Sequence, residues 1–409
     1  MKSDLPAKDI YSALWPLHFV SKIFGLAPYS LKRDDESVTN KSLSNCFCRI
    51  WSIFWIILLM AFEYINTNNL IEIVNLKERI LEALFSSSMY TCSFVSLLLP
   101  LTIYRDKIPQ IITKLSEIDQ VFATMKYGAQ TYENTRLFIT VQISVTTFTV
   151  FALMSYAAYV IHGNFSFRNF HYFFFEIFPT FLNCITILHF VNLVLLLRDK
   201  YKFLNSKLET SIVLPRNVTN LNDIHMNCIT PIENCTFEMK YFSRDTREMN
   251  ISSRRNQPHN LRIIYSLLHE VAHLINSTFG ILLLCTTLWV LISIICGINY
   301  VLKIKHTDSS LYVIVAVLWS IFCASLMTLM AMSCSLAVNE CNRSPVIVQN
   351  IMLREDIDLL VMKELKKMFI QFKVMKIGFS ACGMYRIDLS FLCSIFGATL
   401  SYLIIFWQL

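Results

Sequence analysis

The residues best suited to catalysis lie in the segment His269-Glu270-Val271-Ala272-His273, which matches the pattern His-Glu-x-x-His. In an α-helix, residues four apart lie one turn apart on the same face, so both imidazoles could bind one metal ion. Zinc proteases use this arrangement, and the glutamate between the histidines activates a water molecule. The segment therefore raises the hypothesis of a membrane zinc metalloprotease.

A catalytic zinc site needs a third protein ligand, and the sequence supplies none at a recognisable spacing. Only one of the nine histidines, His306, follows the motif, and it lies in a short loop beyond the next apolar segment. The alternative is an amphipathic helix whose face carries two histidines by chance. We favour this alternative, and we predict no bound metal, no cofactor and no enzymatic activity.

The composition of the 409-residue chain is typical of an integral membrane protein. Hydrophobic residues make up 55% and charged residues 16%, whereas soluble domains carry about 25% charged residues. Glycine and proline are scarce, with eight and ten copies, which argues against disorder and against turn-rich all-β folds. The net charge of +7 does not indicate nucleic-acid binding, because the basic residues sort by loop.

Seven apolar segments are long enough to cross the hydrocarbon core, which takes about 20 residues in a helix. They are residues 46–65, 81–103, 137–161, 173–197, 275–302, 311–338 and 388–409. The predicted fold is therefore an all-α membrane protein with seven transmembrane helices.

Basic residues indicate on which side of the membrane each loop lies. Of the 36 Lys and Arg residues, seven precede residue 50, and five, eleven and eight lie in the loops 104–136, 198–274 and 339–387. The loops 66–80, 162–172 and 303–310 hold two, one and two. Because Lys and Arg are enriched in cytoplasmic loops, we expect a cytoplasmic N-terminus and an extracellular C-terminus, even when the longest loop is discounted.

Glycosylation sequons partly oppose this topology. Three of them, at Asn217, Asn234 and Asn250, lie in the loop that the charge pattern places in the cytoplasm. Sequons arise often by chance in polar, Asn-rich loops, so we give the charge bias more weight. Only Asn164, in the third loop, is predicted to be accessible for glycosylation.

Apolar stripes at helical spacing continue outside the spans. Residues 104–136 are predicted as an amphipathic extension of the second span, 262–274 as an extension of the fifth, and 357–378 as a further helix. Such helices could pack together below the membrane. Residues 11–26 resemble an interfacial helix, whereas 205–258 show no period and are expected to be flexible.

The last apolar segment carries a stripe of small and polar residues. At 100° per residue, one helix face collects Ser390, Ser394, Gly397, Ser401, Ile404, Ile405 and Gln408. Small residues let transmembrane helices approach closely, so the stripe could be a packing seam. It could equally line water, since hydroxyls beside an aliphatic constriction suit a pore helix, and several copies would then surround one axis.

The ending Ser401-Tyr402-Leu403-Ile404-Ile405-Phe406-Trp407-Gln408-Leu409 resembles the terminal signature of insect gustatory receptors, which is Thr-Tyr, five apolar residues and Gln-Phe. Tyr402 and Gln408 match at the family's spacing, while Ser401 replaces Thr and Leu409 replaces Phe. Chain length, seven spans, inverted topology and basic inner loops are also similar to that family. The tract 25–29, Gly-Leu-Ala-Pro-Tyr, resembles an N-terminal segment of its sugar-responsive and closely related branches.

The resemblance implies a tastant-gated, non-selective cation channel that detects sugars, bitter compounds or related cues in the plasma membrane of sensory neuron dendrites. It also implies a homotetramer, or a heteromer with related receptors, whose last helices surround a central pore. The signature and the stripe together give the pore and gate candidates Ser401, Tyr402, Ile404, Ile405, Gln408 and Leu409. The expected partners are a small-molecule tastant and membrane lipid, and no nucleic acid.

The resemblance also implies a ligand pocket in the outer half of each subunit. Aromatic rings and a polar group suit stacking on a sugar or an alkaloid-like tastant. The candidates of suitable depth are Ser87, Tyr90, Tyr156, Glu176, Trp289 and Trp319. Each aromatic residue could instead belong to an interface belt or a helix core. Glu176 is the strongest candidate, because an acid among phenylalanines is costly unless it is partnered or hydrated.

Two other classes of membrane protein fit less well. A G-protein-coupled receptor has the opposite orientation and a cytoplasmic tail, whereas this chain ends directly after its last span. A transporter would be expected to show internal repeats, and none is visible. We divide the chain into a cytoplasmic N-terminal segment with an interfacial helix (1–45), transmembrane helices 1–6 with cytoplasmic extensions (46–338), a cytoplasmic anchor region (339–387) and a pore-lining seventh helix (388–409).

Overall fold

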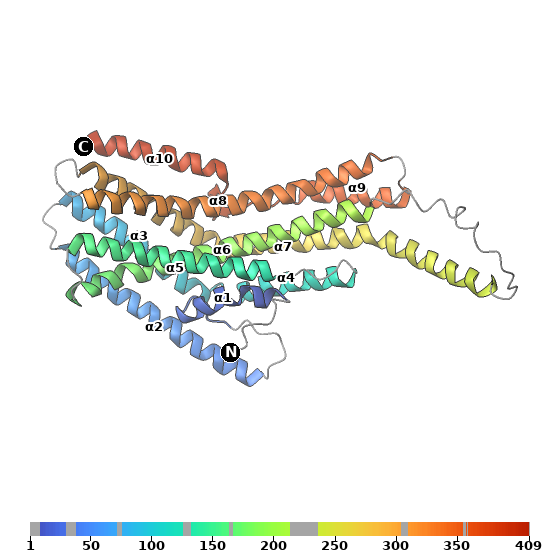
Figure 1. Cartoon of the computed structure of the whole chain (residues 1–409), viewed down its shortest axis with the longest axis horizontal. Coiled ribbons are helices and arrows are strands. Elements are labelled where there is room, and N and C mark those ends of the chain that lie inside the picture. The colour runs from blue at the N-terminus through green and yellow to red at the C-terminus, as the bar shows by residue number, and fades with distance from the viewer. Residues whose placement is uncertain are drawn as a thin grey trace, which may run out of the picture.

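The computed structural model describes residues 9–29, 38–71, 76–125, 132–162, 167–212, 236–303, 310–354, 357 and 359–408. The described part is a bundle of long helices that lie side by side along one axis (Figure 1). Its elements in chain order are α1 (Ile10–Ile23), α2 (Val38–Ile71), α3 (Leu76–Leu101), α4 (Lys107–Thr124), α5 (Glu133–His162), α6 (Phe167–Ile212), α7 (Thr236–Lys303), α8 (Ser310–Met352), α9 (Leu359–Val374), β1 (Ser380–Ala381), β2 (Tyr385–Arg386) and α10 (Leu389–Gln408).

Six helices of the described residues are long and apolar enough to cross a membrane: α2, α3, α5, α6, α7 and α8. Five of them contain one of the first six predicted spans, and α3 covers the second, 81–103, as far as Leu101. This confirms the all-helical membrane fold for this part of the chain. In α10, the stretch Leu389–Tyr402 is apolar but shorter. The seventh crossing and the orientation therefore stay predictions.

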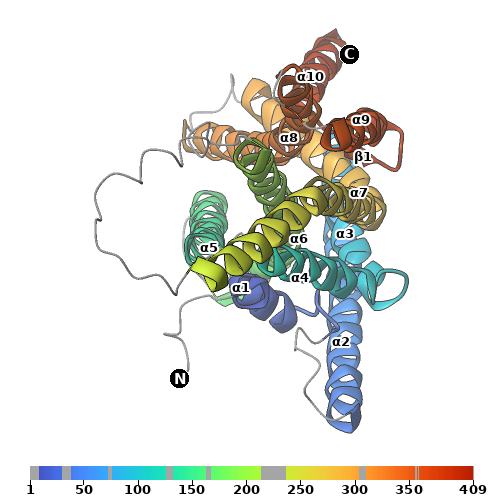
Figure 2. The same ribbon diagram turned by 90° about the vertical axis from the view of Figure 1, so that its right-hand side faces the viewer.

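Helix α6 lies at the centre of the bundle. In its most apolar 18-residue window, 89% of residues are buried, against 17% in α5, although the mean hydropathies of the two helices' windows are 2.0 and 1.9. Figure 2 shows α1, α2 and α4 on one side of this centre and α8, α9 and α10 on the other. The chain thus surrounds one apolar helix with partners that leave their own outer faces exposed.

The prediction that residues 104–136 extend the second span is wrong, because a turn separates α3 from α4. The buried Tyr104 folds back, and its N–H donates to the Leu99 carbonyl at 2.8 Å. Pro100 in the last turn of α3 lacks an N–H, which weakens the helix where it ends. The apolar stripe itself is correct, since Ile111, Leu115 and Phe122 are buried in α4.

The other predicted extensions fare better. Helix α7 runs unbroken through 262–274, and α9 buries Leu365, Met368 and Phe372 of the predicted stripe. Of the segment 205–258, which the sequence predicts to be flexible, residues 205–212 and 236–258 are helical and continue α6 and α7. Lengthening an existing helix needs no new nucleus, so polar segments without a period can extend one that the apolar core stabilises.

A buried ion pair joins three helices toward the end of the bundle away from the last turn of α5 and the first turn of α8. Lys200 of α6 is fully buried and donates to the Asp119 carboxylate of α4 and to the Tyr132 hydroxyl. Tyr132, next to the start of α5, donates to the same carboxylate. Burial and the neighbouring Asp119 charge raise the pKa of Tyr132, so this phenol keeps its proton.

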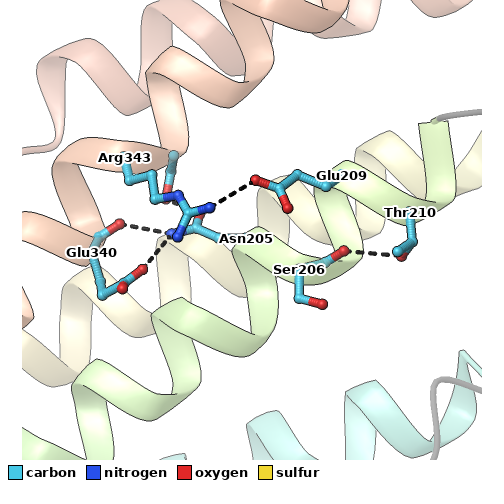
Figure 3. A network of polar contacts seen from close by, with 7 residues as sticks. Asn205, Ser206, Glu209, Thr210, Glu340 and Arg343 are labelled. Atoms are coloured by element: carbon cyan, nitrogen blue, oxygen red, sulfur yellow. Dashed lines mark hydrogen bonds and ion pairs between the residues drawn. The ribbon is translucent and has the colours of Figure 1, made fainter.

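A second polar network at this end joins α6 to α8 (Figure 3). The Asn205 amide donates to the backbone carbonyl and the carboxylate of Glu340, at 2.8 and 3.2 Å, and it accepts from Ser344 at 2.6 Å. Arg343 pairs with Glu209 at 3.1 Å. Because an unpaired buried amide is costly, this network fixes the register between the two helices. We refer to this end, defined by Asp119, Lys200, Asn205 and Glu340, as the anchor end.

The hairpin of β1 and β2 leads the chain from α9 into α10 and rests on α7. The Ser380 N–H donates to the Asn276 side chain at 2.7 Å, and Cys382, with a φ of 51°, lies against Gly280. Asp388 caps α10 by accepting from the Phe391 N–H at 3.0 Å.

Candidate ligand cavity and exposed last helix

A cavity of about 370 Å³ lies near the end of the bundle where α5 ends at His162 and α8 begins at Ser310. Five helices supply its walls at helical spacing, so each presents one face. The lining residues are Leu81, Glu82 and Phe85 of α3, Leu153, Met154, Ala157 and Val160 of α5, Glu176 of α6, Ser293, Cys296, Gly297 and Tyr300 of α7, and Val315, Ala316 and Trp319 of α8. We call this site the outer cavity.

Among the described residues, two carboxylates and no basic side chain line the outer cavity. The hydroxyl of Tyr300 donates to Glu82, which joins α7 to α3 across the cavity. Glu176 is exposed on the isolated chain. The cavity thus carries two acidic side chains, Glu82 and Glu176, within an otherwise apolar and aromatic wall.

The wall combines an aromatic corner with one very close helix contact. Phe85 meets Trp319 edge to face at 6.4 Å between ring centroids, and the buried indole N–H of Trp319 has no partner among the described residues. A Cβ on Gly297 would lie 2.3 Å from the Ser320 Oγ and 3.2 Å from the Ala316 carbonyl oxygen. Glycine at this position therefore lets α7 and α8 meet beside the cavity.

Two of the six predicted ligand residues, Glu176 and Trp319, line the outer cavity. The other four lie elsewhere: Ser87 is exposed, Tyr156 is half-buried, and Tyr90 and Trp289 are buried in the core. None of these four is a cavity-lining residue. The roles of all six in ligand binding stay predictions.

Sequence reasoning missed the residues of α7 that form one wall. Ser293, Gly297 and Tyr300 follow the spacing i, i+4, i+7, which puts them on one face of an otherwise apolar span. A search for polar or small stripes in every span, rather than in the last one alone, would have found this face. Glu82, near the start of the second predicted span, was also not predicted as a site residue.

The small-residue stripe of α10 is exposed in the isolated chain. Ser390, Ser394, Gly397 and Ser401 all face outward, and nothing lies within 4 Å of a Cβ built on Gly397. The opposite face, with Phe391, Leu392, Ile395 and the buried Thr399, packs against the bundle. Within the part of the chain that is described, the stripe is therefore not a packing seam.

Of the pore and gate candidates, Ser401, Tyr402 and Ile404 are exposed on α10. Ile405 and Gln408 are helical, and their side chains are not among those described. Leu409 and the glycosylation candidate Asn164 lie outside the described residues. Figure 1 shows α10 along α8, on the side of the molecule away from α2.

The His-Glu-x-x-His segment forms part of α7, and its glutamate has a structural partner. Glu270 pairs with Lys114 of α4 at 2.7 Å, while His269 is half-buried and His273 is exposed. Among the described residues, no three His, Cys, Asp or Glu side chains are grouped to hold a metal ion. The metalloprotease alternative therefore has no support, and the segment serves the contact between α4 and α7.

Comparison with known proteins relates the chain to receptors. No curated protein sequence matches it. The olfactory receptor OR5 from Machilis hrabei has a similar fold, with a TM-score of 0.64, 11% identity and 97% coverage of both chains. The same receptor in complex with eugenol gives a TM-score of 0.65 at 12% identity, again with 97% coverage of both chains.

A family profile described as 7tm Chemosensory receptor matches residues 14–409, almost the whole chain. This match confirms the predicted membership of a chemosensory receptor family, and it agrees with the shared fold. These relatives are receptors, not enzymes. The chain therefore belongs to the 7tm chemosensory receptor family.

Proposed function

We propose that the chain is a subunit of a tastant-gated, non-selective cation channel. It lies in the plasma membrane of sensory neuron dendrites, with its N-terminus in the cytoplasm and its C-terminus outside. The terminal signature from Ser401 to Leu409 supports the gustatory type, and the charge asymmetry of the loops supports the orientation. The exposed stripe of α10 carries the channel proposal, because it leaves a polar helix face that other subunits would enclose.

The ligand binds in the outer cavity. Its apolar and aromatic walls favour a ligand with a ring or aliphatic body, and Glu82 and Glu176 favour a positive charge or hydrogen-bond donors on that ligand. A protonated amine on an apolar body, as in alkaloid-like bitter compounds, satisfies both conditions. A sugar satisfies the second condition better than the first. The neighbour's complex with eugenol supports a small organic ligand for this fold.

Two helices connect this cavity to α10. Helix α7 supplies Ser293, Gly297 and Tyr300 to the cavity and, further along, Gly280 and Asn276 to the hairpin that precedes α10. Helix α8 supplies Trp319, and its Ser335 accepts from the Leu389 N–H at 3.2 Å. A ligand that shifts α7 against α8 would thus move both supports of the pore helix.

Four copies around one axis would bring the stripes of α10 together. The exposed face of α10 is wide. Beside the small residues it also carries four exposed large side chains, Phe396, Leu400, Tyr402 and Ile404. A single helix cannot enclose a pore, so the polar stripe needs copies of itself or of a related receptor. A homotetramer is the simplest assembly, and a heteromer fits the same geometry.

Calcium imaging of cells that express the chain tests the ligand site with amines, sugars and volatile odorants. Glu176→Gln removes one cavity carboxylate, and we expect about a tenfold loss of potency for cationic ligands, with neutral ligands less affected. Glu209→Gln is the matched control, because Glu209 pairs with Arg343 at the anchor end. Equal effects of both variants would contradict the outer cavity as the ligand site. Responses to volatile odorants alone would refute the taste proposal.

Cysteine accessibility tests the pore. On a Cys393→Ser background, Ser401→Cys should be modified by a methanethiosulfonate reagent and lose its current. Thr399→Cys, two residues away on the buried face of α10, should resist modification. Equal block at both positions would contradict a pore lined by the exposed stripe.

A further inference from the structure

An apolar groove lies between α1 and the first turns of the span in α2, away from the outer cavity. Its volume is about 240 Å³, and it is lined by Phe19, Lys22, Ile23, Phe47, Cys48 and Trp51. The span in α2 begins at Cys46, so the groove lies at the boundary of the apolar core. We call this site the boundary groove.

The two helices are held together at the closed end of the boundary groove. The Ser52 hydroxyl donates to the Gly25 carbonyl at 2.6 Å, and a Cβ on Gly25 would lie 2.9 Å from the Trp55 ring. The indoles of Trp51 and Trp55 both donate to the Ile23 carbonyl, at 2.6 and 3.0 Å. These bonds satisfy the carbonyls of Ile23, the last residue of α1, and of Gly25, so they hold together the two helices that form the groove.

The outer face of α1 is apolar although it does not pack on the protein. Ile10, Leu14 and Leu17 are buried against the bundle, whereas Trp15 and Phe19, stacked at 5.1 Å, are exposed on the other side. On α2, Phe47, Ile50 and Phe54 are exposed as well. The exposed aromatic surface of both helices thus continues into the boundary groove.

Lys22 places a positive charge among these apolar side chains. It is half-buried, and no carboxylate of the described residues lies within ion-pair distance of it. A lysine beside an apolar groove attracts an anion that carries an apolar chain. The chemistry that fits both features is that of an anionic phospholipid.

We propose that the boundary groove binds one anionic phospholipid of the cytoplasmic leaflet. The headgroup accepts from the Lys22 ammonium, and an acyl chain lies between Phe19 and Phe47. This placement rests on the proposed orientation, which puts the start of α2 at the cytoplasmic face, where anionic lipids concentrate. The bound lipid covers the aromatic face of α1 and ties this helix to the membrane.

The test measures lipid retention by the purified full-length receptor and needs no tastant. The protein is reconstituted in phosphatidylcholine containing a minor share of phosphatidylserine, and the lipid retained after detergent extraction is counted by mass spectrometry. Lys22→Ala should lower phosphatidylserine retention about fivefold, the scale of one basic residue at an anionic surface, and leave phosphatidylcholine unchanged. Lys22→Arg should retain the wild-type value.

Lys107→Ala provides the matched control. Lys107 is the first residue of α4, and its ammonium lies over the Tyr104 ring, away from the groove. It should leave phosphatidylserine retention unchanged. Wild-type retention in Lys22→Ala, or an equal loss in Lys107→Ala, would show general attraction of anionic lipid and overturn the proposal. If the wild-type receptor retains phosphatidylserine as expected but gives no tastant response, that result counts against the proposed channel function and not against the lipid site.

Discussion

Helices α6, α7 and α8 pass through both ends of the bundle, and the side chains between them differ in kind from one end to the other. At the anchor end, Lys200, Asn205 and Glu340 are buried or half-buried in paired networks. At the outer cavity, the Trp319 N–H has no partner among the described residues, and Glu176 is exposed. These polar side chains at the anchor end thus pair with one another, whereas Trp319 and Glu176 at the outer cavity are available to a ligand.

The difference suggests a division of labour along the same helices. Paired buried groups hold one arrangement, because removing one partner leaves a costly charge or amide. A cavity with unpaired groups has packing alternatives that differ little in free energy, so a ligand can select among them. We therefore expect substitutions at the anchor end to change stability and substitutions at the outer cavity to change ligand response.

The largest effect is expected at the buried ion pair. Asp119→Leu leaves the fully buried Lys200 without its carboxylate, which should cost about 3–5 kcal/mol of unfolding free energy. The double variant Asp119→Leu/Lys200→Met should recover much of that loss, since no buried charge remains. Thermal unfolding of the purified receptor measures both variants. A smaller loss of stability in Asp119→Leu than in the double variant would contradict this explanation.

Gly297→Ala should show the next largest effect, and it acts at the other end. The added Cβ meets the Ser320 side chain and the Ala316 carbonyl, so α7 and α8 must separate, at a cost of about 1–3 kcal/mol. Because this contact borders the outer cavity, ligand potency should change as well. Gly378→Ala, where nothing lies within 4 Å, is the control and should leave the ligand dose response at its wild-type value.

Trp319→Phe should give a smaller effect that is limited to ligand response. The ring is largely kept and the unpaired N–H is removed, so a ligand that accepts from this group should lose about 1 kcal/mol, or roughly fivefold in potency. Trp289→Phe makes the same change in the core, away from the cavity. If both variants shift the dose response equally, the effect comes through packing.

An effect of pH is expected on the docking of α1. Burial, with the nearby charges of His189 and Lys22 adding to it, lowers the pKa of His18 to about 3. A histidine whose pKa is lowered by folding contributes its full stability above pH 6.5, and this stability falls as the pH drops below that value. Between pH 7 and 5 the unfolding free energy should decrease by about 1–2 kcal/mol. His18→Gln should remove this contribution and make the dependence shallower, which unfolding curves at both pH values would reveal.

Much of the fold could be predicted from the sequence. Apolar length located six spans, the stripe within 104–136 predicted a buried face on α4, and the terminal signature indicated the family. These features are local, since a span, a stripe and a motif each depend on residues close together in the chain. The break between α3 and α4 was missed because it depends on how Tyr104 folds back and becomes buried.

The tertiary structure alone decided which residues form each site. Hydropathy measures transfer out of water, and it does not distinguish burial in lipid from burial in protein, so it could not tell the central α6 from the peripheral α5. For the same reason Tyr90 and Trp289 were predicted beside Trp319, although only Trp319 lines the outer cavity. The sequence determined which helices enter the membrane, and the contacts between helices determined which of their faces meet each other, the lipid or a ligand.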